Sequence, residues 1–365
     1  LNIQTKNDSE NEIGGNNNTV LALQQKMFSR SNVSFLFINR QATSNKDFIV
    51  PEEKYNRVVG IDYNLANIDN SWNGKFYAHK SFTSNLDSKN YSTGTRLDYS
   101  SKNWGFRASG LYVGENFKSD LGFIRRTDIF KIDPKVEYLL FPKQGKINRH
   151  NFSVVPIIVW KPEINFQLAD YNIISSWNTE FNNTSRLSVS IFNRYVYLFD
   201  EFNPSFSDGL SLEMDTDYNF SSIELNLQTD TRKPFSFKTK PSMGQFFNGF
   251  KYTFDAEISY RIQPKFLFSI RARYDKIELP QPYSNNNIWL VSPRINITFT
   301  KSLYWSTLIQ YSSLLENLGI NSRLQWRFAP LSDLFLVYND NYFTDSEFAP
   351  RFRSINLKIT YWLYL

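Results

Sequence analysis

The sequence contains no cysteine, and its 365 residues include only two histidines, His79 and His150. A chain without thiols forms no disulfide, and this composition is compatible with passage through an oxidising compartment. Zinc sites are built mainly from Cys and His side chains, and two histidines in separate regions cannot supply such a set. We therefore expect no metal and no cofactor, and we expect each histidine to be a strand or turn residue.

Long apolar segments are also missing. No run of about 18 or more apolar residues occurs, which excludes membrane-spanning helices. A sustained 3.6-residue apolar period with capping residues is absent as well, so the helix content is predicted to be very low. The chain has no Walker loop, no GxGxxG fingerprint and no GxSxG elbow, the common signatures of nucleotide binding and of serine hydrolases.

Charge is spread along the chain rather than concentrated. The net charge is +6, but Lys and Arg occur singly along alternating segments, so we expect solvated faces and no nucleic-acid partner. The opening stretch LNIQTKNDSE has neither a basic start nor an apolar core, and we do not expect it to be a signal peptide. The adjacent Glu52 and Glu53 lie in a polar connector and are expected to be solvated rather than catalytic.

Aromatic residues are abundant. They make up 17% of the chain, with 33 Phe, 21 Tyr and 8 Trp, which suits a protein that needs aromatic girdles at two membrane interfaces. The tryptophans fall mostly near the ends of predicted strands, where the interface favours such rings. The expected interface residues are Trp72, Trp104, Trp160, Trp177, Trp289, Trp305, Trp326 and Trp362.

Alternation of apolar and polar residues is the dominant pattern. In the segment KYTFDAEISYRI, residues 251–262, one set of alternate positions is aromatic or aliphatic and the other is polar or charged. Successive side chains of a strand point to opposite faces, so this segment predicts a strand with one apolar and one charged face. The same alternation recurs in residues 186–199, 266–274, 288–300, 302–311, 320–328 and 355–365.

The connectors between these segments have their own regularity. Tight turns such as NNTS and QPK are separated by longer polar connectors such as DEFNPSFSDG, which predicts a strict alternation of short and long connectors. This arrangement is typical of a transmembrane up-and-down antiparallel β-barrel with short periplasmic turns and long extracellular loops. We predict an all-β barrel of about 20 strands (18–20). Single-chain barrels have even strand numbers, and this rule favours twenty. Residues 1–365 are predicted to form one domain.

The polarity of the two faces decides which solvent each one meets. Arginines at the centre of a bilayer would cost about 2 to 4 kcal/mol each, so the charged faces are expected to line a lumen. The predicted lumen residues are Asp255, Glu257, Arg261, Arg271, Arg273, Asp275, Arg294, Arg323, Arg327 and Lys358. The predicted outward residues are Phe254, Ile258, Phe268, Ile270, Ile297, Ile309, Leu324, Leu357 and Ile359.

A hairpin around Gln263 and Pro264 brings opposite charges together. In any near-symmetric register, Asp255 and Glu257 come opposite or diagonal to Arg271 and Arg273 on one face. Each such cross-strand pair contributes about 0.2 to 1 kcal/mol. Two interpretations stay open: the ladder stiffens the wall of a wide barrel, or it forms a charged constriction that selects solutes.

Two further expectations concern the loops and the C-terminus. The connectors at residues 41–56 and 199–209 mix aromatics with proline and acids, and are the expected inward-folding loops. Counting back from Leu365, the alternate positions Leu363, Tyr361, Ile359 and Leu357 are similar to the terminal signal read by barrel-assembly machinery. Such signals usually end in an aromatic residue, whereas here Tyr364 is the last but one.

Several stretches resemble a known family. They are SRSNVSFLFINRQ, YNRVVGIDYNLA, LGFIRRTDI, KIELPQPYS and, above all, residues 303–340. Together they resemble the barrel region of an uncharacterised outer-membrane family common in Bacteroidota, in which the barrel follows a domain similar to family-9 carbohydrate-binding modules. The resemblance implies an outer-membrane barrel from a Gram-negative bacterium. It implies no established activity and no catalytic residue. No part of this sequence resembles the upstream domain of the family.

Three functional classes follow from these observations. The first is a pore, transport or translocation barrel with a charged, water-accessible lumen and no enzymatic activity. The second is a non-catalytic membrane anchor or a subunit of a larger outer-membrane assembly. The third is a barrel hydrolase, which would depend on His79 or His150 at the rim. The expected partners are outer-membrane lipid and lipopolysaccharide, the assembly machinery, and other outer-membrane or periplasmic proteins.

Overall fold

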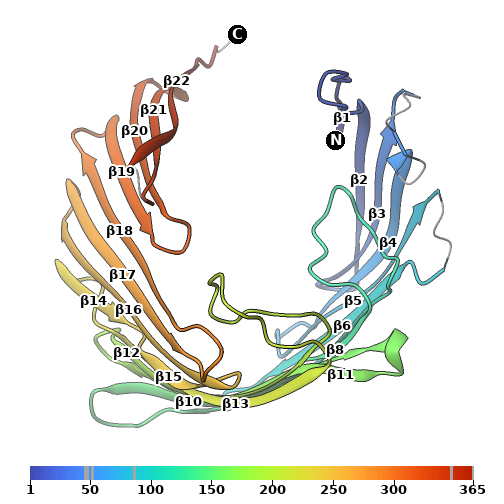
Figure 1. The fold of residues 1–365 in the computed structure, drawn as a ribbon, viewed down its shortest axis with the longest axis horizontal. Helices are drawn as coiled ribbons and strands as arrows, with labels where there is room; N and C mark the ends of the chain where they lie inside the picture. Colours follow the sequence, from blue (N-terminus) through green and yellow to red (C-terminus); the bar gives the residue numbers. More distant parts are fainter. Residues whose placement is uncertain (45–48, 51–52, 85–87, 346–347, 364–365) are drawn as a thin grey trace. The chain divides into compact units, whose positions relative to one another are not determined.

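The computed structural model describes residues 1–44, 49–50, 53–84, 88–345 and 348–363, and it is an all-β structure (Figure 1). A 3-10 helix, η2 (Pro162–Ile164), interrupts the strands. The described part of the chain contains no helix long and apolar enough to cross a membrane. The strands are β1 (Asn2–Gln4), β2 (Asn16–Met27), β3 (Ser31–Ala42), β4 (Tyr55–Ala66), β5 (Trp72–Thr83), β6 (Tyr91–Ser100), β7 (Trp104–Val113), β8 (Ile129–Ile132), β9 (Lys135–Leu140), β10 (Ile147–Lys161), β11 (Gln167–Phe181), β12 (Arg186–Leu198), β13 (Thr216–Gln228), β14 (Phe235–Thr239), β15 (Ser242–Phe246), β16 (Gly249–Ile262), β17 (Phe266–Glu278), β18 (Asn286–Thr298), β19 (Leu303–Ser312), β20 (Asn317–Ala329), β21 (Ser332–Phe343) and β22 (Ala349–Thr360).

The 22 strands belong to one antiparallel sheet with up-and-down connections. Contacts divide the chain into two compact units: the first is Leu1–Leu139, Phe152–Ser175 and Arg194–Tyr197, and the second is Leu140–Asn151, Ser176–Asn193 and Leu198–Leu365. Strands β1 to β8 lie in the first unit and β13 to β22 in the second, while β9 to β12 contribute to both. Each unit is described separately below, and the prediction of a single domain stays a prediction.

Strands β8 and β9 are two parts of one interrupted strand. Both pair with β7 in the same register, with Val113 opposite Ile129 and Trp104 opposite Tyr138. The interruption falls at Pro134, which has no N–H to donate to the ladder. Beside it, the Ser109 hydroxyl donates to the carbonyl oxygen of Asp133 at 2.9 Å. A side chain therefore supplies part of the bonding at the break.

Strands β14 and β15 show the same arrangement. Against β13, Leu227 lies opposite Thr239 and Ser222 opposite Gly244, so the register continues across the gap. The gap contains Pro241, whose carbonyl oxygen still accepts a bond from the Leu225 N–H at 3.0 Å. Counted in this way, the 22 segments of the described residues form twenty strands. The sequence also predicts about 20 strands.

The connectors differ from the predicted strict alternation of short and long. Four long connectors, residues 5–15, 43–54, 114–128 and 199–215, each follow an odd-numbered strand when the two interrupted strands are counted as one each. Two others at positions predicted to be long are instead tight: residues 247–248 join β15 to β16, and residues 313–316 join β19 to β20. At the first of these, Phe247 has a φ of 52°, a left-handed conformation that closes a short turn.

In both units the burial of side chains is inverted relative to a water-soluble sheet. In the second unit Phe254 is 53% exposed, whereas its neighbour Asp255 is 8% exposed. In the first unit Ile61 is 55% exposed, whereas Asn56 is completely buried. Sheets of soluble proteins bury the apolar face and expose the polar one. In each unit, exposed apolar side chains therefore neighbour buried polar ones.

Candidate functional site

One face of the sheet in the second unit carries most of its charged residues, while the ion pairs Asp340–Arg353 and Lys276–Glu278 lie on the opposite face. The registers of β16 to β22 link opposite positions step by step, for example Ser269 with Arg294 and Ser306 with Arg323. They place all ten predicted lumen residues, from Asp255 to Lys358, on the first face. The nine residues predicted to point outward all lie on the opposite face. We call these two surfaces the polar face and the apolar face.

The hairpin of β16 and β17 has the near-symmetric register that the sequence implies. Asp255 lies opposite Arg273, and Glu257 lies opposite Arg271. The strongest contact is diagonal: Arg271 donates from Nε to Asp255 Oδ1 at 2.9 Å and from Nη2 to Oδ2 at 2.5 Å. Such bidentate pairing fixes both orientation and charge. Arg271 therefore contacts Asp255, and Glu257 is left with a 3.4 Å contact from the Ser259 hydroxyl.

Arg273 belongs to a second charge cluster on the same face. Its Nε donates to Asp275, two residues along β17, at 3.0 Å. The Thr253 hydroxyl donates to the same carboxylate at 2.5 Å, and the Lys251 ammonium lies 3.8 Å away. Asp275 is buried, and these donors compensate for its lost hydration. The face thus carries linked ion pairs in place of a single straight ladder.

Replacing Asp255 by Asn tests the value of the first pair. We expect Asp255→Asn to lower the free energy of unfolding by about 1 to 2 kcal/mol, because a half-exposed Arg271 loses a bidentate charged acceptor. Glu257→Gln is the matched control and should change stability by less than about 0.5 kcal/mol. Denaturant unfolding in detergent, followed by tryptophan fluorescence, measures both. Equal effects of the two variants would contradict this assignment.

The remaining predicted residues of the polar face have diverse partners. Arg327 lies 3.3 Å from Asp333, and Arg261 donates to the carbonyl oxygen of Thr231. Arg294 lies opposite Ser269 and Leu308, Arg323 opposite Ser306 and Val337, and Lys358 opposite Phe335. The polar face is therefore charged but not uniformly so, with apolar side chains between the arginines.

The eight tryptophans lie within about four residues of a strand end, and all but one are exposed. Trp72 and Trp104 are the first residues of β5 and β7, and Trp305 is the third of β19. Trp160 is only half-buried, next to the end of β10. The others are Trp177, Trp289, Trp326 and Trp362. Their arrangement in two belts stays a prediction.

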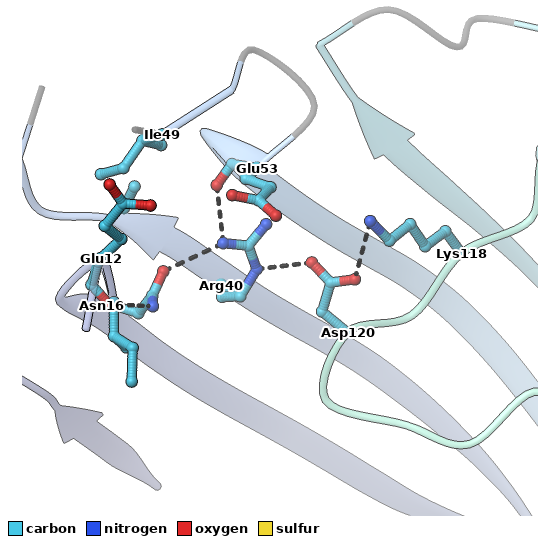
Figure 2. A pocket seen from close by; sticks show the side chains of 10 residues that line it. Glu12, Asn16, Arg40, Ile49, Glu53, Lys118 and Asp120 are labelled. Atoms are coloured by element: carbon cyan, nitrogen blue, oxygen red, sulfur yellow. Dashed lines mark hydrogen bonds and ion pairs between the residues drawn. The ribbon is translucent and has the colours of Figure 1, made fainter. Parts of the chain in front are cut away.

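The first unit holds a polar cluster that the sequence does not reveal (Figure 2). The side chain of Arg40, on β3, donates from Nε to Asp120 at 2.5 Å and from Nη1 to Asn16 at 3.0 Å and to the Glu53 carbonyl at 2.7 Å. Lys118 lies 3.4 Å from the other oxygen of Asp120. These residues line a cavity of about 380 Å³.

Two completely or almost completely buried polar side chains lie beside this cluster. The Asn56 amide donates to the Lys118 carbonyl and accepts from the Asp120 N–H, both at 3.0 Å. The hydroxyl of Ser81, 1% exposed, accepts from the Lys118 N–H at 3.2 Å. Buried amides and hydroxyls of this kind are tolerated only when bonded. Here they bond the backbone of connector 114–128.

The register of β4 and β5 places Asn56, Asp62, His79 and Ser81 on one face of the first unit, which we call the polar face of that unit. His79 lies there next to a carboxylate. Its Nε2 is 3.2 Å from Asp62, and its ring lies 4.7 Å from the Tyr77 ring. Gly60 leaves room for the ring, because a Cβ at that position would lie 2.2 Å from His79 Cδ2. Ser92 is opposite His79, but its hydroxyl donates to the Tyr112 carbonyl at 3.2 Å.

His150 lies in the second unit and has its own partners. Its Nδ1 is 2.9 Å from the Thr179 hydroxyl, and the Trp177 indole N–H points to the same nitrogen at 3.2 Å. The rings of His150 and Trp177 are stacked with centroids 6.0 Å apart. Within the described ranges, no group of three or more His, Asp or Glu side chains could hold a metal ion.

Outside the strands, a turn between β13 and β14 holds an ion pair. The Arg232 guanidinium donates to both oxygens of Asp230 at 2.9 Å, and this holds the pKa of Asp230 well below its usual range. In the loop before β6, the ion pair with Glu163 raises the pKa of Lys89. The Asp230 carboxylate and the Lys89 ammonium therefore keep their charges at neutral pH.

Residues 199–209, which are predicted to fold inward, belong to connector 199–215, and the contacts of this connector involve the polar face. Phe202 and Leu212 form a bridge within the connector, and Leu212 is completely buried. Asn286, the first residue of β18, donates to the Ser205 carbonyl at 2.7 Å. Asn286 lies opposite Ile277, a polar-face position that is also completely buried. The connector therefore packs against one end of the polar face of its own unit.

Other predictions fall partly on residues that the structure does not describe. In connector 41–56, residues 45–48 and 51–52 lie outside the described ranges, and Glu52 is among them. Glu53 is described, and its carbonyl accepts from Arg40. At the C-terminus, Leu357 and Ile359 are exposed on the apolar face, whereas Tyr364 and Leu365 lie outside the described residues.

Taken together, these features define an all-β protein whose antiparallel up-and-down strands carry polar side chains on one face and exposed apolar side chains on the other. The chain belongs to the family described as a domain of unknown function, DUF5916, whose model matches residues 2–315. No curated protein matches the chain.

The residues that the sequence reasoning missed are those that bond connector 114–128. Arg40, Asn56 and Ser81 stand at polar positions of ordinary alternating strands, and Asp120 is one acid in a polar connector. The sequence feature that could have indicated these contacts is the connector itself, GENFKSDLGFIRRTD, which is long and mixes aromatic and charged residues. Contacts between a loop and a distant strand leave no periodic trace in the sequence.

Proposed function

We propose that the protein is an outer-membrane β-barrel whose polar face lines a water-accessible lumen, and that it acts as a pore or translocation component. The observation that carries this proposal is the inverted burial of side chains in both units. Apolar residues such as Phe254 and Ile61 are exposed, while charged and polar residues such as Asp255 and Asn56 are buried. Hydrocarbon is the solvent that would favour that arrangement.

The opposite orientation would be costly. It would place Arg271, Arg273 and Arg294 against lipid, at about 2 to 4 kcal/mol for each arginine near the bilayer midplane. It would also leave the aromatic face in a water-filled interior, with no hydrophobic partner. Charge and apolar area therefore both favour the polar face as the inner one.

Closure of the sheet is part of the same proposal. With an even number of strands, β1 and β22 run in opposite directions, so their edges can join by ordinary antiparallel pairing. β22 is paired with β21, and its side chains are exposed on both faces, as expected of a strand whose other edge is available.

Engineered disulfides test closure. The chain has no cysteine, so we expect a cysteine at Ile3 to cross-link with one of a series placed singly along residues 349–354, and not with a control cysteine at Asn321. Mobility on a denaturing gel after mild oxidation gives the answer. Absence of a cross-link along the whole series would contradict closure through these strands.

The proposed location is the outer membrane of a Gram-negative bacterium, where lipid, lipopolysaccharide and the barrel-assembly machinery would be its partners. The transported species is proposed to be polar, because the lining contains arginines and carboxylates rather than an apolar track.

Single-channel recording in a planar bilayer tests the proposed function. Stable current steps from the purified, folded protein are the expected result. Silence from a protein that is folded by circular dichroism and by heat-modifiable gel mobility would contradict the pore. It would favour instead a membrane anchor or a subunit of a larger assembly, and co-purifying partners would then identify that assembly.

A further inference from the structure

We infer that connector 114–128 is a fixed constriction that sets the size of solute able to pass along the polar face. This inference rests on the proposed pore function and names the element that gives the pore its selectivity. The connector joins β7 to β8, and the residues that bond it lie within the first unit.

The connector lies against the polar face and not the apolar one. The side chains that bind it, Arg40, Asn56 and Ser81, belong to three successive strands, β3, β4 and β5. Their registers place them on one face, because Arg40 lies opposite Asn56 and Ser81 lies opposite Val58, two residues along the same strand from Asn56. In Figure 1 the connector, drawn in teal, lies beside β4 and β5.

Its middle is bonded through the backbone. The N–H and carbonyl of Lys118 and the N–H of Asp120 each have a partner in Ser81 or Asn56. Backbone groups bonded to completely buried side chains do not exchange partners with water without opening the structure. The segment is therefore held in place by groups that are themselves fixed by the sheet.

A charged contact adds to these bonds. Arg40, whose side chain is 14% exposed, pairs with Asp120 and is itself held by the Glu53 carbonyl and by Asn16. Figure 2 shows Arg40 between Asp120 and Glu53, with Lys118 on the far side of Asp120. A buried arginine with three acceptors is costly to detach, because each lost acceptor leaves part of its charge unpaired.

Both ends of the connector are fixed as well. At its start, the N–H of Gly114 donates to the Tyr91 carbonyl at 2.9 Å, and a Cβ on Gly114 would lie 2.1 Å from the Lys89 carbonyl oxygen. At its end, Asp128 accepts from the Glu163 N–H at 3.0 Å. A segment bonded at its start, middle and end behaves as a permanent part of the wall rather than as a mobile lid.

Size selectivity follows from this placement. If the polar face lines the water path, the connector occupies part of that path, and the free cross-section beside it limits the solutes. Shortening the connector should therefore raise the size limit without changing the surrounding wall. Connector 114–128, which lies in the described part of the chain, would thus set the size limit for solutes.

The test is a liposome-swelling assay with neutral sugars from a pentose to a tetrasaccharide. In one variant a short Gly-Ser linker replaces Phe117–Arg126. In the second, Asn56→Leu keeps the loop but removes its central bonds. We expect the shortened variant to admit the tetrasaccharide at least about tenfold faster than the wild type, with Asn56→Leu in between. Asn73→Leu is the control, because its amide donates only to the nearby Asn70 carbonyl.

Hydrogen exchange gives a readout that does not depend on conductance. The amides of Lys118 and Asp120 should be protected in the wild type and in Asn73→Leu, and should lose protection in Asn56→Leu. This result identifies release of the connector even if the shortened variant fails to fold.

The outcomes separate the two proposals. If the wild type and the shortened variant admit sugars up to the same size, the proposed constriction is wrong and the proposed pore still stands. Sugars that pass neither folded protein would overturn the pore, and the constriction with it. Passage through the shortened variant alone would support both. Unprotected Lys118 and Asp120 amides in the wild type would contradict a fixed connector.

Discussion

Arginine in place of Ile309 should lower the free energy of unfolding by about 2 to 4 kcal/mol, the cost of a guanidinium in the centre of the lipid-facing side. Ile309 lies on the apolar face of β19 opposite Ile320. The adjacent Gln310 lies on the polar face opposite Gly319 and is exposed. Gln310→Arg adds the same charge one residue away, and should change stability by no more than about 0.5 kcal/mol.

Reversible unfolding in lipid vesicles measures this pair of variants, because the cost depends on hydrocarbon rather than on detergent. A large loss for Ile309→Arg with a small change for Gln310→Arg would support lipid contact on the apolar face. Small changes in both variants would mean that this face meets water. A larger loss for Gln310→Arg would reverse the assignment of the faces.

A methyl group added at Gly60 should have the second large effect, a loss of about 1 to 3 kcal/mol from overpacking. The new Cβ would lie 2.2 Å from the His79 ring, which cannot simply move away because Asp62 holds its Nε2 at 3.2 Å. Gly110→Ala is the matched control, since the nearest atom to its Cβ would be a methyl carbon of Thr95 at 3.6 Å.

A double variant identifies the cause of that loss. If the clash with the ring is responsible, the double variant Gly60→Ala/His79→Ala should have nearly the same denaturation midpoint as His79→Ala alone. Additive losses in the double variant would assign the effect of Gly60 to the backbone instead. The single variant His79→Ala also shows how much the ring contributes to stability, because it removes the contact with Asp62.

The strand pattern was predictable because it is periodic. A face of the sheet is specified at every second residue, so the assignment of Asp255 or Arg323 to a face is repeated many times along the chain. The strand breaks at Pro134 and Pro241, residues that cannot donate to a ladder, were not predicted, and Pro156 and Pro293 lie inside unbroken strands. Register and face are therefore properties that short segments determine.

The choice of partners was not predictable in the same way. The sequence left open whether Asp255 and Glu257 lie opposite or diagonal to Arg271 and Arg273. In the structure Arg271 bonds both oxygens of Asp255 from the diagonal position, and Arg273 bonds Asp275. Which of two near neighbours an arginine contacts depends on side-chain geometry at the scale of an ångström. The contacts of Asn56 with connector 114–128 join residues far apart in sequence, and alternation carries no information about them.

The two connectors expected to fold inward illustrate the same limit. Composition pointed to residues 199–209, and the structure packs connector 199–215 against Asn286 and Ile277. Composition also pointed to residues 41–56, of which Glu53 takes part in the Arg40 cluster. Connector 114–128 also contacts a polar face, but it was not singled out, because its anchoring residues lie in the strands rather than in the loop.

The central claim is that the apolar face contacts lipid and the polar face contacts water. Single cysteines along β16 test it most directly, because the chain has no other thiol. In vesicles, a fluorophore at Phe254 or Ile258 should be quenched by spin-labelled lipid, whereas cysteines at Thr253 or Glu257 should react with a small water-soluble reagent and resist the lipid quencher. Reversed labelling, or labelling without a two-residue period, would contradict the account.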